Sequence, residues 1–106
     1  MLIKAQDKTK TLLIYRANTK ISWKKLRKIK YVGKKAQMAS EEDVHELGLK
    51  PGGVPPFPTL FGLKGIIDIN FPKIKEMAFN AGHKEKSIIM ETEAYPTEGC
   101  TFEDIT

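Results

Sequence analysis

The sequence predicts a single α+β domain with a mixed or antiparallel β-sheet and short helices. A length of 106 residues with 41% hydrophobic residues suits one compact core. Short apolar runs alternate with two segments that carry helix-start signals, and they do so without a βαβ rhythm. No internal repeat or low-complexity segment indicates a repeat protein.

The expected strands are runs rich in β-branched and aromatic residues. The first two pair with each other across the polar turn QDKTK, and the last two are joined by the turn NAGHKEK. A helical turn after Pro72 precedes the second-to-last strand. The expected strands are residues 1–5, 11–17, 34–39, 65–69, a short run that ends at 80, and 87–92.

Two helices are expected from their capping residues. Ser22 is an N-cap for SWKKLRKI, with Trp23, Leu26 and Ile29 facing inward, and Gly33 ends this segment. Ser40 opens SEEDVHEL, with acidic residues in the first turn, and Gly48 stops it.

The net charge of +5 is unevenly distributed. Eight of the eighteen basic residues lie between positions 20 and 35, which we call the basic segment. After Lys86 the chain has acidic residues and no basic ones. Such a segment can neutralise phosphates of a nucleic acid, or it can be an ordinary solvated helix face. The basic residues are Lys20, Lys24, Lys25, Arg27, Lys28, Lys30, Lys34 and Lys35.

Several classes of protein are not indicated. No run approaches the ~20 apolar residues of a membrane span, and the N-terminus lacks a signal-peptide pattern. Cys100 is alone, which excludes an internal disulfide and a cysteine zinc cluster. We therefore expect a cytoplasmic protein without metal or cofactor, in which Cys100 is an ordinary thiol.

The stretch KPGGVPPFP (50–58) holds four of the six prolines. Pro51 followed by glycines is typical of a type II turn, and the later prolines fix φ and lack N–H groups. The remaining N–H donors therefore lie on a stiff backbone that a ligand can approach closely at glycine. Such a loop can bind a carbonyl, carboxylate or phosphate, or it can be a rigid connector.

LGLKPGGVPPF, IIDINF and FNAGHKEKSIIM, in this order, resemble the YbaK family of aminoacyl-tRNA deacylases, which is related to the editing insertion domain of bacterial prolyl-tRNA synthetase. SWKKLRK resembles the family's basic helix. The resemblance spans residues 1–90, which we expect to be a YbaK-like domain lacking its N-terminal part. Residues 91–106 are expected to be an acidic C-terminal tail.

The resemblance implies hydrolysis of the ester that joins an amino acid to tRNA, of the Cys- or Ala-tRNA(Pro) type. It needs no protein nucleophile, because water or a substrate group can attack while backbone donors stabilise the oxyanion. The implied partners are aminoacylated tRNA and prolyl-tRNA synthetase. The implied substrate-binding residues are Gly52, Gly53, Val54, Pro55, Pro56, Asn80 and Gly82, and the implied tRNA-binding residues are Lys24, Lys25, Arg27 and Lys28.

The chain departs from the family at both ends. The family's functional lysine aligns just before Met1, and we do not transfer its role to Lys4. We therefore expect one of three cases: a fragment, a short member completed by a second copy, or a relative that has lost catalysis. A non-catalytic module that binds RNA or protein is the alternative function. Asp68 either orders the pocket or caps a turn.

Overall fold

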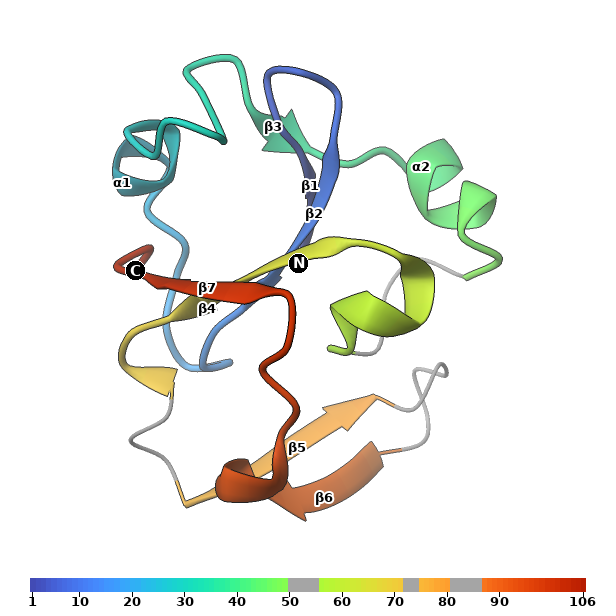
Figure 1. Ribbon diagram of the computed structural model, residues 1–106, viewed down its shortest axis with the longest axis vertical. Helices are drawn as coiled ribbons and strands as arrows, with labels where there is room; N and C mark the ends of the chain where they lie inside the picture. The colour runs from blue at the N-terminus through green and yellow to red at the C-terminus, as the bar shows by residue number, and fades with distance from the viewer. Residues whose placement is uncertain (50–55, 72–74, 81–86) are drawn as a thin grey trace.

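The computed structural model describes residues 1–49, 56–71, 75–80 and 87–106. Its main sheet has five strands in the order β3-β1-β2-β4-β7 (Figure 1). β1 pairs antiparallel with β2 and β3, whereas β2–β4 and β4–β7 are parallel pairs. The predicted α+β class with a mixed sheet is thus confirmed. The strands are β1 (Leu2–Lys4), β2 (Lys10–Ile14), β3 (Gln37–Met38), β4 (Lys64–Asp68) and β7 (Cys100–Glu103).

A separate two-stranded sheet consists of β5 (Glu76–Asn80) and β6 (Ser87–Glu91). These strands pair antiparallel in a register that sets Asn80 opposite Ser87, as expected of two strands joined by a hairpin turn. Figure 1 shows this sheet below the five-stranded one. The helical turn expected after Pro72 and the turn 81–86 lie outside the described residues.

The central strands bury side chains on both faces of the main sheet. On β2, Leu12 and Ile14 belong to one hydrophobic cluster, and Leu13 belongs to a second cluster on the opposite face. On β4, Ile67 and Ile66 divide in the same way. A strand that is buried on both faces has a continuous apolar sequence. This explains why LLI in β2 and GII in β4 show no alternation of polar and apolar residues.

The first cluster, on the face of helix α2 (Glu41–Glu46) and the two-stranded sheet, includes Val44, Phe71, Met77 and Tyr95. The second cluster lies on the face of helix α1 (Trp23–Arg27) and includes Leu26, Val32 and Ile105. The sheet is therefore the middle layer of the domain.

Helix α1 (Trp23–Arg27) begins at the predicted cap, where the Ser22 hydroxyl oxygen accepts from the Lys25 N–H (3.3 Å). Leu26 is fully buried, as expected. The helix is shorter than the sequence predicts: it ends at Arg27, and turns carry the chain to Gly33 (φ 88°). These turns bring Val32 and Leu26 into one cluster, which one continuous helix would not do.

Helix α2 (Glu41–Glu46) has the predicted capping box between Ser40 and Asp43. The backbone N–H of Ser40, the Lys4 ammonium (3.0 Å) and the Ser40 hydroxyl all contact the Asp43 carboxylate. These hydrogen bonds, that of the Ser40 backbone first, lower the pKa of Asp43 to about 2. Lys4 is therefore engaged in holding α2 against β1.

The segment 91–106 contributes to the main sheet. After the 3-10 turn Thr92–Ala94, strand β7 pairs with β4, and Ile105 is fully buried. The predicted boundary at residue 90 stays a prediction, but this acidic segment supplies both a strand and a core residue. No helix among the described residues has the length and hydropathy to cross a membrane.

Gly65 on β4 leaves no room for a side chain. A Cβ atom there would lie 2.6 Å from the Cys100 sulfur and 2.7 Å from Cγ of Pro58, which begins the 3-10 turn Pro58–Phe61. The absence of a side chain lets β7 and this turn pack against β4 together. The Cys100 thiol is half-buried, and its burial raises its pKa, as befits a packing residue rather than a nucleophile.

Candidate functional site

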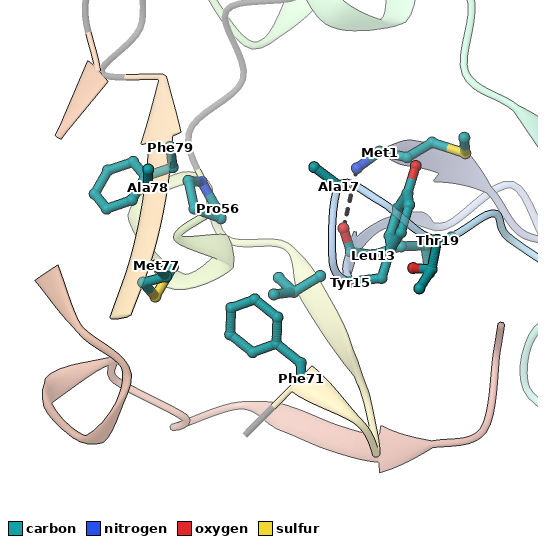
Figure 2. Close-up of a pocket in the computed structure, with 11 residues that line it drawn as sticks. Met1, Leu13, Tyr15, Ala17, Thr19, Pro56, Phe71, Met77, Ala78 and Phe79 are labelled. Carbon is teal, nitrogen blue, oxygen red and sulfur yellow. Dashed lines mark hydrogen bonds between the residues drawn. The ribbon is translucent and has the colours of Figure 1, made fainter. Parts of the chain in front are cut away.

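A cavity of about 390 Å³ lies between β2 and the two-stranded sheet. Figure 2 shows Pro56, Met77, Ala78 and Phe79 on one side, Met1, Tyr15, Ala17 and Thr19 on the other, and Phe71 between them. Its volume falls within the range of small-ligand sites, roughly 300–1,000 Å³.

The first wall is built by the end of β2 and the turn that follows it. Met1 and Leu13 exchange two backbone hydrogen bonds (2.8 and 3.0 Å), which extend the β1–β2 pairing to the rim of the cavity (Figure 2). The Thr19 hydroxyl and N–H both donate to the Arg16 carbonyl (2.7 and 3.0 Å), which closes the turn beyond β2. This wall is therefore fixed by backbone hydrogen bonds.

The opposite wall is held by aromatic contacts. Phe57 lies edge-to-face with Phe79 (centroids 5.0 Å apart) and stacks on Tyr95 (5.5 Å). The Tyr95 hydroxyl donates to the Pro56 carbonyl oxygen. Phe71 contacts Tyr95 edge-to-face at 6.1 Å. These rings join β5, the end of the proline-rich stretch and the segment after β6 into one unit.

The structure brings together two of the sequence motifs that implied a substrate site. Pro56, the last residue of the predicted substrate loop, lines the cavity, and so does the part of β5 that leads to Asn80. The remaining predicted substrate-binding residues lie outside the described residues; they are Gly52, Gly53, Val54, Pro55 and Gly82. Their roles stay predictions.

Most side chains of the described lining are apolar. Among its described residues, Tyr15 and Thr19 are the polar side chains. Burial raises the pKa of Tyr15, so its hydroxyl is protonated at neutral pH. The described part of the chain contains no group of three or more His, Cys, Asp or Glu residues placed to hold a metal ion. A lining of this kind can hold a small side chain of a ligand, and it contributes few polar side chains of its own.

Asp68 does not line the cavity. Its carboxylate is fully buried and accepts from the Ile105 N–H (3.2 Å) and the Thr106 hydroxyl (3.0 Å). It therefore anchors the segment after β7, a role that differs from both expectations for this residue.

The four predicted tRNA-binding residues divide into two pairs. Lys24 and Lys28 are exposed on α1 and its C-cap. The Lys25 ammonium is paired with Asp104 (3.1 Å). The Arg27 guanidinium donates twice to the Ala36 carbonyl (3.1 and 3.2 Å) and lies 5.0 Å from the Trp23 ring centroid. Lys25 and Arg27 thus already have partners within the domain.

Sequence reasoning missed the aromatic residues of the site. Tyr15, Phe71, Phe79 and Tyr95 were not assigned to it, because each looks like an ordinary core residue in its own segment. The feature that distinguishes them is proximity in space to Pro56 and to each other, across segments that are distant in sequence.

Comparison with known proteins identifies the family of the chain. The family model described as an aminoacyl-tRNA editing domain matches residues 1–97. The chain belongs to this family. The expected resemblance to YbaK-type editing domains is thereby confirmed, and this editing domain holds its cavity where two of the family-like motifs meet.

Two similar proteins are multifunctional Ser/Thr-tRNA deacylases ProXp-y, from Escherichia coli strain K12 and from E. coli O157:H7. Each is 42% identical over 65 residues, a match that covers 59% of this chain and 39% of the relative. The editing domain described here thus spans well under half of these relatives' length. A crystal structure of a Marinobacter aquaeolei VT8 protein, described as a signal transduction protein, has the same fold, with a TM-score of 0.80, 20% identity and coverage of 98% of this chain and 23% of that one.

Proposed function

We propose that this editing domain hydrolyses the ester bond of misacylated tRNA. The observation that carries the proposal is that Pro56 and the strand leading to Asn80 line the same cavity of about 390 Å³. Membership of the editing-domain family supports the same reading. The aminoacyl group would occupy this cavity, and the backbone of residues 52–56 would hold its carbonyl oxygen.

The reaction needs little from side chains. An aminoacyl ester is already activated, so a water or a substrate hydroxyl can attack the carbonyl carbon while backbone N–H groups donate hydrogen bonds to the developing oxyanion. The described lining fits this mechanism, because its side chains offer two hydroxyls and no carboxylate, imidazole or thiol. These two hydroxyls belong to Tyr15 and Thr19.

The substrate class is a short amino acid on tRNA. The family resemblance implies Cys- or Ala-tRNA(Pro), whereas the similar E. coli proteins are Ser/Thr-tRNA deacylases, which adds Ser- and Thr-tRNA to the candidates. The exposed Lys24 and Lys28 would contact the tRNA backbone, which would place the domain with the translation apparatus in the cytoplasm. Association with prolyl-tRNA synthetase or with a second copy is a further part of the proposal.

The experiment measures loss of the labelled amino acid from Ala-, Cys-, Ser- and Thr-tRNA in the presence of the 106-residue chain. We expect faster hydrolysis of at least one of them than without protein. Gly53→Val and Ala78→Leu should slow it, since each adds bulk to the proposed substrate site. Ala94→Leu adds the same volume as Ala78→Leu at an exposed position outside the cavity and should have no effect.

A folded wild-type chain that hydrolyses none of the four would contradict the proposal. If that chain still bound tRNA, the result would favour the alternative function, a non-catalytic RNA-binding module. Full activity of both Gly53→Val and Ala78→Leu would instead show that the active site lies outside this cavity.

A further inference from the structure

Tyr95 connects the end of the proline-rich stretch to the rest of the domain. Its side chain is buried, with 6% of its surface exposed, and its hydroxyl donates to the carbonyl oxygen of Pro56. The two residues are 39 positions apart, so this contact depends on the tertiary fold.

The ring of Tyr95 reaches two residues next to the same cavity. It stacks on Phe57 at an interplanar angle of 28° and meets Phe71 edge-to-face at 67°. Phe57 in turn meets Phe79 at 79°. Since Phe71 and Phe79 line the cavity, the Tyr95 ring sets the spacing of the rings that bound it.

The hydroxyl has a role that the ring cannot supply. Pro56 has no N–H, so its carbonyl is its one backbone hydrogen-bonding group. A donor at this carbonyl fixes the orientation of the peptide that follows Pro56. Burial raises the pKa of Tyr95 above its ordinary value, so the hydroxyl keeps its proton and can donate at neutral pH.

We infer that Tyr95 is a positioning residue for the substrate site: its hydroxyl holds Pro56, and with it the cavity edge that faces the aminoacyl group. This inference rests on the proposed deacylase function. Tyr95 acts through Pro56 and has no place in the cavity lining itself. Its effect should therefore be on the rate of the bound complex and not on tRNA binding, which we assign to lysines elsewhere.

The test compares Tyr95→Phe with the wild type in kcat and KM for the most rapidly hydrolysed aminoacyl-tRNA. Phenylalanine keeps the ring contacts and removes only the hydroxyl. We expect kcat to fall roughly five- to tenfold, the factor that one hydrogen bond corresponds to, with KM unchanged.

Ile66→Val is the matched control for stability. Ile66 is fully buried in the cluster on the opposite face of the sheet, so the substitution destabilises the domain without touching the cavity. It should leave kcat unchanged. Equal losses of kcat in Tyr95→Phe and Ile66→Val, or a folded Tyr95→Phe variant with wild-type kcat, would overturn the inference.

A second measurement is independent of activity. The ring NMR resonances of Phe57 and Phe79 should shift in Tyr95→Phe and stay in place in Ile66→Val. In the wild type, the Tyr95 hydroxyl proton should exchange slowly with water. If the wild type hydrolyses no aminoacyl-tRNA, the proposed function fails, yet these resonances still decide whether Tyr95 positions Pro56. Unshifted resonances with a rapidly exchanging hydroxyl would refute the positioning role.

Discussion

Replacing Asp68 tests how the segment after β7 is attached to the domain. The Asp68 carboxylate is fully buried at the end of β4, and its two oxygens accept from the Ile105 N–H at 3.2 Å and the Thr106 hydroxyl at 3.0 Å. The parallel pairing of β4 with β7 ends at Asp68 and Glu103. The carboxylate therefore continues the attachment beyond the last strand pair.

Asp68→Ala removes both hydrogen bonds and leaves the N–H of the buried Ile105 without its acceptor. An orphaned buried donor costs about 1–3 kcal/mol, and the lost bond to the threonine hydroxyl adds about 1 kcal/mol. The free energy of unfolding should therefore fall by about 2–4 kcal/mol. Asp68→Asn keeps one acceptor oxygen and should lose less than half as much.

Urea unfolding followed by Trp23 fluorescence and circular dichroism measures these differences. Asp104→Ala is the control, because it removes an exposed carboxylate that pairs with Lys25 in the same segment. Such an exposed pair contributes about 0–1 kcal/mol. An Asp68→Ala variant no less stable than Asp104→Ala would refute the reasoning that burial, rather than charge, determines the contribution.

Three further predictions follow from contacts described above. The lowered pKa of Asp43 contributes stability that is complete above its unfolded-state pKa of about 4 and is lost as the pH falls towards 2, so Asp43→Asn should flatten the acid limb of a thermal-unfolding series. Gly65→Ala should cost about 1–3 kcal/mol in urea unfolding, since its methyl group has no room between two neighbouring side chains; a neutral effect would mean that these neighbours yield easily. Lys24→Ala combined with Lys28→Ala should weaken tRNA binding and reduce its salt dependence by about two charges, whereas Lys25→Ala should change both less; equal effects would show that the Lys25 ion pair opens for tRNA.

The parts of the fold that depend on local sequence could be predicted. Ser22 and Ser40 mark both helix starts, because a capping hydrogen bond joins residues only three apart. The apolar runs around Leu13 and Ile66 identified central strands. The mixed topology agreed with the absence of a βαβ rhythm.

The parts that depend on distant partners could not be predicted. Strand β7 has partly exposed residues such as Phe102 and lies in an acidic stretch, so nothing local distinguishes it from a solvated segment. The engagement of Lys25 and Arg27 is set by Asp104 and Ala36, which the sequence does not place beside them. The role of Tyr95 could not be predicted for the same reason, because its partner Pro56 is 39 positions away in the sequence.

The parallel pairs of the main sheet have a consequence for the order in which the chain folds. The β1–β2 hairpin closes over a short turn, because Lys4 pairs with Lys10. Pairing of β2 with β4 instead joins Thr11 to Lys64, which are far apart in the sequence. Closing a long loop costs more chain entropy before any contact compensates for it. The hairpin should therefore form early, and the docking of β4 and then β7 should limit the folding rate. Because the cavity needs both β2 and the segment around Pro56, its walls would come together only in this late step.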